Sequence, residues 1–519
     1  MAAAVALIPL AYLLIRAGEA GAANWFDYVL TDRVARLATR SMLLGAVVAG
    51  GCLLIGVGCA LLVTRTDLPG RRVFAVAAAL PLAVPSYVAA FSWVSVADLW
   101  SSTARFEGFW AAALVLTLYT YPYVYLPVAA SLVGADQGQE EVARSLGRGP
   151  WRTLFGVTLP QVRPAIAGGG LLAVLYVLSD FGAVSILRVD TFTRAVFTAF
   201  SAGFDRVGAI TLSTVLLLLT VVILVIEGRT RRAGARYAKA GGGARRPPQP
   251  ALLGAGRWVA LCGMLAVLVA ALGVPATAMA RWLSAGVSRP GSMGDVVQAA
   301  VGSLSVSAAG AAVTMLLALP VGVLIARHPG RLAGLLEAAA YLAHSLPGVV
   351  VGLSLVFFGV SVMLPLYQTT WLLALAYATL FLPLGMAAVA GAAAQAPPAL
   401  EEVGQSLGHS PWRAFTRITL PLTLPGIGAG AAMVFLTCMK ELPATLLLRP
   451  TGLDTLATEL WAATAVERYA EAAPYAVLLV ALAAAPTWVL AVRSGVVAAG
   501  DRPAQPATEP DQVRVRVGG

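Results

Sequence analysis

Two acidic residues inside apolar stretches are the first candidates for chemistry. Asp180 and Glu441 are 261 residues apart, and each lies about 24 Å along its stretch, at about 1.5 Å of helix rise per residue. A charged side chain inside a membrane span is costly, so it faces a partner or an aqueous path. The pair predicts a gate, or a transient oxygen-ligand site for a hard cation whose binding Lys440 weakens. Two alternatives stay open: Lys440 pairs with Asp180 between the halves of the chain, or the carboxylates lie among headgroups and contact a protein outside.

Other chemistries are disfavoured by the residue inventory. The cysteines have no CxxC spacing, so they predict neither a disulfide framework nor a zinc site. The two lysines do not follow a glycine, which rules out a phosphate-binding loop ending in Gly-Lys. We assign no catalytic residue and no metal ligand, and any ATP hydrolysis must take place on another polypeptide. The residues concerned are Cys52, Cys59, Cys262, Cys438, the scattered His328, His344 and His409, and Lys239 and Lys440.

The composition predicts an all-α protein that spans a membrane many times. Hydrophobic residues make up 59% of the chain and charged residues 12%, about half the charged fraction of a soluble domain. Runs of apolar residues that are long enough to cross a bilayer as a helix recur along the chain. Prolines inside them, as in LPLAVPSYV, are tolerated in membrane helices. The predicted spans are 2–16, 41–64, 73–99, 109–134, 165–188, 207–227, 257–280, 296–326, 332–360, 370–395, 424–448 and 472–493.

A polar segment occurs twice in this apolar chain. Residues 140–166 and 401–427 keep a constant offset of 261 residues and are identical at 14 of 27 positions. Each copy contains a pair of glutamates, a Ser-Leu-Gly, a Pro-Trp-Arg and a Thr-Leu-Pro. Two matching loops predict two equivalent docking points for a partner outside the membrane.

The arginines give the orientation and the domain organisation. Loops rich in arginine stay in the cytoplasm, and both repeated loops fall on that side, although Arg33, Arg36 and Arg40 lie on the other. The basic charge is expected to face lipid rather than nucleic acid. Each half enters the membrane the same way round, so we expect two parallel six-helix repeats. The predicted parts are a first half at 1–228, a basic cytoplasmic linker at 229–256, a second half at 257–495 and a disordered tail at 496–519.

The repeated loop resembles the cytoplasmic EAA loop of ATP-binding-cassette importer permeases. In that pattern E-A-A is followed by three residues, a glycine, nine residues and I-x-L-P, and both copies keep the spacing. Valine replaces the middle alanine in both, and glycine replaces the last alanine in the second copy, which weakens that helix by about 1 kcal/mol. The glycine is expected where backbones approach closely, and the proline at a rigid exit into the next span. The implied coupling residues are Glu140, Glu141, Ala143, Gly147, Leu159 and Pro160 in the first loop, and Glu401, Glu402, Gly404, Gly408, Leu420 and Pro421 in the second.

The segments after the two loops resemble one particular group of these permeases. LSDFGAVSIL at 178–187 and the KELPATLLLRP stretch at 440–450 are similar to segments of fused ferric-iron permeases. The resemblance implies the type I importer fold in a bacterial plasma membrane, two ATPase subunits that bind ATP and magnesium, no cofactor in this chain, and a binding protein that delivers Fe(III) for alternating access. Thiamine, phosphonate, polyamine or sulfate are alternative cargoes. An ion-coupled secondary transporter is the alternative of another class, and a membrane scaffold is disfavoured by the symmetric acidic residues.

Overall fold

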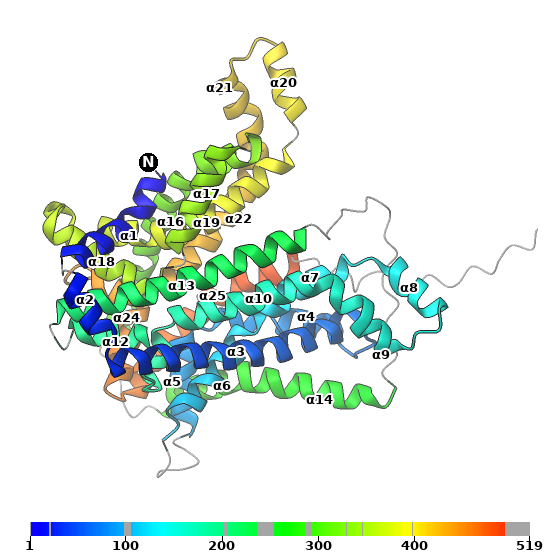
Figure 1. Ribbon diagram of the computed structural model, residues 1–519, viewed down its shortest axis with the longest axis horizontal. Coiled ribbons are helices and arrows are strands. Elements are labelled where there is room, and N and C mark those ends of the chain that lie inside the picture. Colours follow the sequence, from blue (N-terminus) through cyan, green and yellow to red (C-terminus); the bar gives the residue numbers. More distant parts are fainter. Residues whose placement is uncertain are drawn as a thin grey trace, which may run out of the picture.

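The computed structural model describes residues 2–19, 22–97, 105–201, 203, 205–235, 254–285, 293–328, 330–344, 346–396 and 398–493. All regular elements within these ranges are helices, and none is a strand. The helices form two bundles that lie together at the end that holds α12 and α24 and diverge toward the ends that hold α20 and α8 (Figure 1). The predicted all-α membrane fold is confirmed.

Within the described ranges, the first half contains thirteen α-helices, one short 3₁₀-helix (η1) and one short π-helix (η2). They are α1 (Ala2–Glu19), α2 (Ala22–Val29), α3 (Asp32–Arg65), α4 (Arg71–Ala77), η1 (Leu80–Ala83), α5 (Ser86–Ala97), α6 (Phe109–Thr120), α7 (Pro122–Val133), α8 (Gln137–Ser145), α9 (Pro150–Thr153), η2 (Leu154–Thr158), α10 (Leu159–Ser179), α11 (Gly182–Ile186), α12 (Phe192–Ser201) and α13 (Arg206–Ala235).

The second half follows a similar order, with the single helix α19 in the place of α6 and α7. It contains α14 (Gly256–Leu268), η3 (Val269–Gly273), α15 (Val274–Ala285), α16 (Met293–Arg327), α17 (Arg331–His344), α18 (Gly348–Ser361), η4 (Leu364–Leu366), α19 (Thr370–Gln395), α20 (Pro398–Ser406), α21 (Pro411–Ala414), η5 (Phe415–Thr419), α22 (Leu420–Lys440), α23 (Pro443–Leu448), α24 (Leu456–Ala465) and α25 (Tyr469–Arg493).

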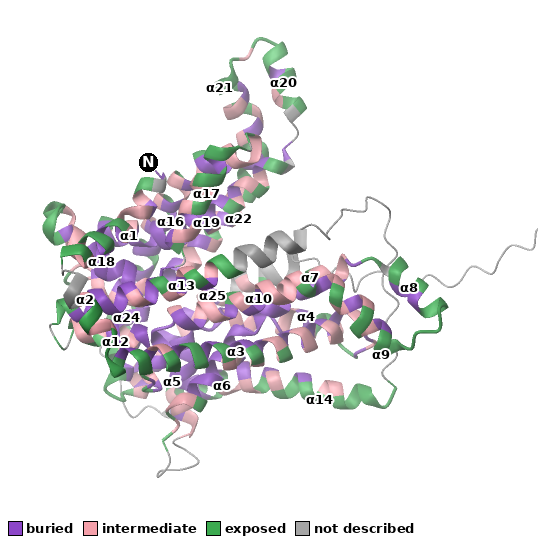
Figure 2. Ribbon diagram, viewed as in Figure 1, coloured by how far each residue is buried: buried purple, intermediate pink, exposed green. Residues whose placement is uncertain are grey.

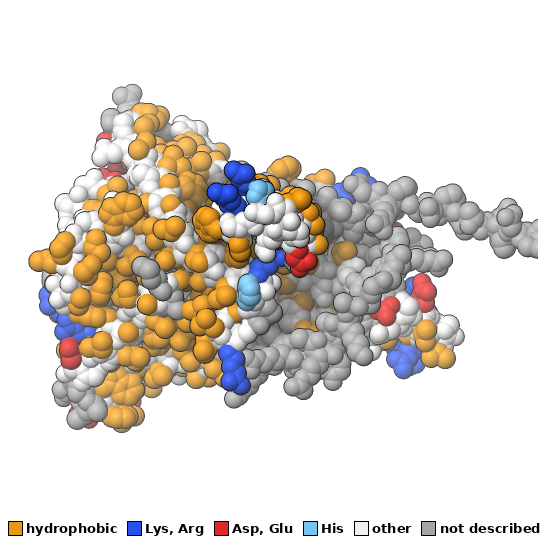
Figure 3. Space-filling model, turned by 90° about the horizontal axis from the view of Figure 1, so that it is seen from above, with side chains coloured by type: hydrophobic (Ala, Val, Ile, Leu, Met, Phe, Trp, Pro, Cys, Tyr) orange, Lys and Arg blue, Asp and Glu red, His pale blue; other side chains and the backbone are white. Residues whose placement is uncertain are grey.

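The predicted spans coincide with helices, but not all of them are straight. Within the described ranges, eight helices are long and apolar enough to cross a membrane, and two bent pairs bring the number to 10. Helix α1 and the apolar stretch 469–484 of α25 cover the first and last predicted spans. Seen from above, the surface is largely hydrophobic, and charged side chains gather where α20 and α21 project (Figure 3). That distribution fits a lipid-facing belt with a polar end.

Each half has one predicted span that bends sharply, and a second, at 165–188 and at 424–448, in which the helix is broken at Asp180 and at Glu441. Residues 71–83 and 86–97 meet at 95°, and residues 331–344 and 348–361 meet at 99°. Pro85 and Pro347 stand at the two breaks. Proline supplies no backbone N–H and pushes the preceding residue out of the helical region, so the chain turns there. The expectation of continuous spans at 73–99 and 332–360 was therefore wrong.

The first helix of each half packs on the opposite half. Helix α1 lies against α17 and α18, and α15 lies against α5. Arg16 donates to the hydroxyl of Ser361 at 2.6 Å, and the sulfur atoms of Cys59 and Met264 are 3.7 Å apart. The two halves are therefore interlocked rather than merely adjacent.

The boundaries of the predicted linker are only partly described. Helix α13 continues to Ala235 and so extends past residue 228, and α14 begins at Gly256. Residues 236–253 and the predicted tail at 496–519 lie outside the described residues.

Candidate functional site

The two repeated loops fold in the same way. In the first, α8 is followed by a turn, by α9, by the π-helical turn η2 and by α10; in the second, α20, α21, η5 and α22 follow in the same order. The two loops lie at the free ends of the two diverging bundles, and both are far from α12 and α24 (Figure 1). Their helices are mostly exposed (Figure 2). The structure therefore gives the chain two matching protruding helices.

Gly147 and Gly408 end these helices with a left-handed backbone. Their φ angles are 79° and 88°, a region in which a side chain is strained. A Cβ atom built on either glycine meets no atom within 4 Å. The glycine is therefore required by its backbone angle as a helix C-cap, and not by the close backbone approach that we expected.

Pro160 and Pro421 lie inside continuous helices. The helix that contains Leu159 and Pro160 runs from Pro150 to Ser179, and its counterpart from Pro411 to Lys440. A proline inside a helix removes one backbone donor, and the π-helical turn just before each proline accommodates the change in hydrogen bonding. Each loop is therefore joined to its span by uninterrupted helix.

The first glutamate of each pair is bound inside its own half. Glu140 lies 3.1 Å from Arg65 at the end of α3, and its Oε1 accepts from Thr158 at 2.9 Å. Arg65 also donates to the Leu132 carbonyl at 3.1 Å. The Arg65 and Glu140 side chains are only 11% and 9% exposed. We call this set the first anchor; it ties α8 to α3 and to the π-helical turn.

The second loop has an equivalent second anchor. Glu401 lies 3.2 Å from Arg327 at the end of α16, and it accepts a hydrogen bond from Thr419. Glu401 and Thr419 are each 261 residues after their first-half counterparts, whereas Arg327 is 262 after Arg65. The loops are therefore fixed to the membrane domain at the same points.

The second glutamate and three apolar residues of each loop face outward. Glu141 and Glu402 are exposed. Large apolar side chains lie beside them with closely matching exposed fractions: 58% and 56% for Val142 and Val403, 76% and 77% for Leu146 and Leu407, and 71% for both Trp151 and Trp412. Large exposed apolar groups mark interaction sites. Sequence reasoning missed these residues as a docking surface, although their identity in both copies was visible.

The glycine at the last EAA position has a packing reason. A Cβ atom on Gly404 would lie 2.5 Å from Cδ1 of Ile418. The first loop has the buried Ala143 at the equivalent position and the smaller Val157 in place of Ile418. Compared with the first loop, the second loop therefore lacks one methyl group at Gly404 and has one additional carbon at the facing Ile418.

Asp180 caps the short helix α11 instead of facing an open path. Its Oδ2 accepts from the backbone N–H groups of Ala183 and Val184 at 3.1 and 3.2 Å. Ser86, just after the bend at Pro85, donates to Oδ1. The buried carboxylate is thus fully hydrogen-bonded within the first half, as a buried charge must be.

Glu441 occupies the equivalent place in the second half. It accepts from the backbone N–H groups of Ala444 and Thr445, both at 3.0 Å, and so caps α23. A Cβ atom on Gly348, just after the bend at Pro347, would lie 2.5 Å from Glu441 Oε1. Each carboxylate therefore joins the bend of one span to the short helix that ends another.

Lys440 connects the two halves without an ion pair to either carboxylate. Its Nζ donates to the Leu82 carbonyl of η1 at 3.2 Å, and Tyr87 donates to the Lys440 carbonyl at 3.4 Å. The structure thus places Lys440 against the first half, but the alternative in which it pairs with Asp180 does not match this geometry.

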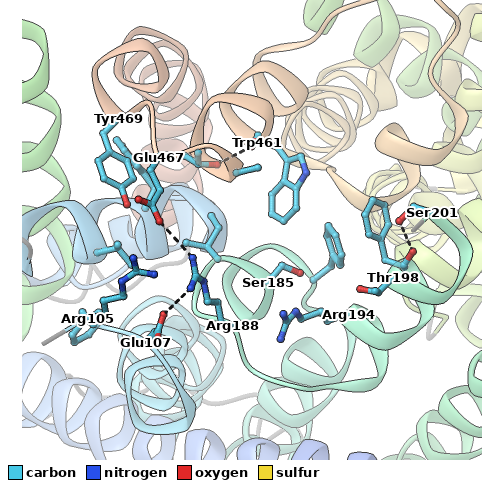
Figure 4. Close-up of a pocket in the computed structure, with 18 residues that line it drawn as sticks. Arg105, Glu107, Ser185, Arg188, Arg194, Thr198, Ser201, Trp461, Glu467 and Tyr469 are labelled. Atoms are coloured by element: carbon cyan, nitrogen blue, oxygen red, sulfur yellow. Dashed lines mark hydrogen bonds and ion pairs between the residues drawn. The ribbon is translucent and has the colours of Figure 1, made fainter. Parts of the chain in front are cut away.

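A cavity of about 660 Å³ opens between the halves at the end opposite the loops. Its walls come from α5, α11, α12 and α24 and from the segments around Glu107, Arg188 and Glu467. Figure 4 shows Arg188 between Glu107 and Glu467, with Arg105 on one side of it and Arg194 on the other, below Ser185. Among the described residues, no group of three His, Cys, Asp or Glu side chains is arranged to hold a metal ion.

Comparison with known proteins agrees with this duplicated architecture. The family described as "Binding-protein-dependent transport system inner membrane component" matches residues 53–232 and again 318–497. The chain is 36% identical to the "Fe(3+)-transport system permease protein FbpB 2" of Haemophilus influenzae over 93% of this chain and 95% of that protein. It is 27% identical to the Escherichia coli "Molybdenum transport system permease protein ModB" over 38% of this chain and 94% of that protein, and 22% identical to the E. coli "Sulfate transport system permease protein CysW" over 44% and 83%.

Proposed function

Because this chain belongs to the family of binding-protein-dependent transport system inner membrane components, we propose that it is the permease of an ATP-driven importer whose cargo is Fe(III). The chain is a multi-pass transport permease of the inner membrane and not an enzyme. Its similarity to an Fe(3+) permease over nearly its whole length supports iron as the cargo. The shorter matches to sulfate and molybdenum permeases make an oxyanion the second candidate.

The matched docking surfaces carry the proposal of an ATPase partner. Each loop exposes a valine, a leucine and a tryptophan next to a glutamate, with almost the same exposed fractions in both copies. Two equal surfaces fit two copies of one partner, which would bind ATP and magnesium. Aromatic side chains with an apolar surround are typical of the residues that dominate binding energy. Glu141 and Glu402 would fix the register of the partner, and the two anchors would hold the loops.

The helices give a mechanical route from the ATPase to the outer end. Closure of two ATPases would move α8 and α20. The anchors would pass that movement to α3 and α16, and the continuous helices from Pro150 and Pro411 would pass it to Asp180 and Glu441. These carboxylates hold α11 and α23 against the bent spans. We therefore assign them to the gate as positioning groups. Alternating exposure follows from rocking of the two halves, and a binding protein would deliver cargo at the outer end.

Transport in proteoliposomes tests the proposal. The permease is reconstituted with its co-purifying ATPase and binding protein, and uptake of radiolabelled Fe(III), sulfate, thiamine and phosphonate is measured with and without ATP. ATP-dependent uptake of iron alone is expected. ATP-dependent uptake of another solute would support the assignment as an importer but show that its cargo is not iron. Uptake driven by an ion gradient without an ATPase would show a secondary transporter instead.

A further inference from the structure

The outer cavity carries more arginine than a site for a bare metal cation would tolerate. Three arginines line it, Arg105, Arg188 and Arg194, against two carboxylates, Glu107 and Glu467. The two glutamates are both used by one arginine, since Arg188 lies 3.6 Å from Glu107 and 3.4 Å from Glu467. The cavity is therefore positively charged on balance.

The other two arginines differ in their partners. Arg194 lies 3.0 Å from Asp190, which is outside the residues that line the cavity. Arg105 has an exposed side chain with no ion pair to any residue in the described ranges. A guanidinium group offers a planar fork of donors that matches carboxylate and phosphate oxygens. Arg105 is thus the group most ready to receive an anionic ligand.

The remaining walls suit a small enclosed ligand. Phe91, Phe181, Phe197 and Trp461 line the cavity, and the rings of Phe181 and Trp461 meet across the two halves at 5.1 Å. The hydroxyl of Ser185 is buried, lines the same cavity and has no hydrogen-bond partner. The cavity volume falls within the range of small-molecule sites, about 300 to 1,000 Å³. An apolar wall with a few convergent polar groups is the usual form of such a site.

We infer that this cavity binds the cargo as an anion: a small Fe(III) complex whose outer surface presents carboxylate or phosphate oxygens. The inference rests on the proposed iron function and specifies the form in which iron crosses. A bare Fe(III) ion needs several hard oxygen ligands, but the two carboxylates of the cavity are already paired. The same charge disfavours cationic cargo such as thiamine or a polyamine.

Direct binding of ferric citrate to the permease–ATPase complex in nanodiscs tests the inference. Equilibrium dialysis with radiolabelled iron and a fixed excess of citrate gives the dissociation constant. Arg105→Gln should weaken binding about ten- to a hundredfold, the loss typical of one charge-assisted hydrogen bond, and Arg105→Lys should weaken it less. The control is Arg468→Gln, which removes the same charge from an exposed pair with Glu471 and does not line the cavity. It should change binding less than twofold.

Other results overturn the inference in distinguishable ways. Equal binding by wild type and Arg105→Gln would show that the cavity does not hold the complex, and tighter binding by the variant would show a cation site. Loss of binding-protein docking with unchanged ferric citrate binding would show that the arginines receive an acidic loop of that protein. If the wild type takes up sulfate and no iron, the proposed iron function fails. If Arg105→Gln then weakens the binding of sulfate, the cavity is still a site for an anion.

Discussion

Arg188 and Glu467 form an ion pair of 3.4 Å between the two halves, and both hold a left-handed backbone, with φ of 56° and 61°. Such a conformation is uncommon outside glycine and costs about 1 kcal/mol or more for each residue. Their side chains are 51% and 56% exposed, so the pair itself contributes at most about 1 kcal/mol. A weak contact that joins the halves at the outer end is suited to breaking and re-forming in each transport cycle.

Loss of this contact should favour the state that is open to the outside. Glu467→Gln removes up to about 1 kcal/mol from the closed outer end, which corresponds to a change of about fivefold in the equilibrium. We expect the basal ATP hydrolysis of the permease–ATPase complex to rise two- to fivefold without binding protein. Glu471→Gln is the matched control, because Glu471 pairs with Arg468 in its own half. An equal rise in both variants would contradict a specific role for the Arg188 pair.

Adjacent glutamates of the first loop should behave differently when mutated. Glu140→Ala leaves the nearly buried Arg65 without its carboxylate, and breaking such a pair costs about 3 kcal/mol or more. We expect a lower melting temperature and loss of the assembled transporter. Glu141→Ala should leave the melting temperature within error and lower ATP-coupled uptake. Thermal unfolding in detergent separates the two effects.

A double variant checks whether the first anchor is structural. Replacing both members of a buried pair by apolar residues is often neutral for stability, so Arg65→Met with Glu140→Leu should recover most of the melting temperature that Glu140→Ala loses. Failure of the double variant to recover it, together with weaker ATPase binding, would place Glu140 in direct contact with the partner.

Much of the fold follows from local sequence properties. The spans can be recognised because the length and hydropathy of an apolar run depend only on neighbouring residues. The two halves can be recognised because residues 261 positions apart match, as Asp180 matches Glu441 and Trp151 matches Trp412. The crossing of α1 and α15 to the opposite halves was not predictable in this way. Membrane helices of similar hydropathy do not carry information about which neighbour they contact, since lipid and protein are almost equally apolar.

The site was predictable only in part. The two repeated segments fold as matching loops, as the repeat suggests, but the different surroundings of Glu140 and Glu141 depend on Arg65, which approaches from a helix that ends 75 residues earlier. Adjacent residues on a helix point in different directions, and the sequence does not say which direction is buried. The capping role of Asp180 likewise depends on the bend at Pro85, which brings Ser86 to its carboxylate.

The exchange of one methyl group in the second loop can be tested by substitution. Gly404→Ala gains about 1 kcal/mol of helix propensity, but its Cβ atom overlaps Ile418, and overpacking costs about 1 to 3 kcal/mol. We expect a melting temperature equal to or slightly below that of the wild type. Adding Ile418→Val removes the overlap and should raise it above the wild type. If Gly404→Ala alone stabilises as much as the double variant, Ile418 moves freely and the packing argument fails.

The exposed tryptophans of the loops should contribute strongly to ATPase binding. Trp151→Ala with Trp412→Ala removes two large aromatic contacts, and interface residues of this kind often contribute about 2 kcal/mol or more. We expect the ATPase to dissociate during purification and the melting temperature of the permease to stay unchanged. Trp110→Ala is the control, since Trp110 is 74% exposed at the start of α6, away from the loops. Retention of the ATPase by the double variant would remove these surfaces from the interface.

Substitutions at Asp180 distinguish a helix cap from a charged gate. Asparagine keeps an oxygen that can accept from the Ala183 and Val184 N–H groups, and its amide can meet Ser86, so Asp180→Asn should preserve folding and most iron uptake. Asp180→Ala leaves these donors without a partner, and loss of a cap costs about 1 to 2 kcal/mol, so we expect a lower melting temperature and reduced uptake. Glu441→Gln and Glu441→Ala should show the same contrast. If Asp180→Asn folds normally but abolishes uptake in proteoliposomes, the negative charge itself is required, and the carboxylate acts in the transport path rather than as a cap.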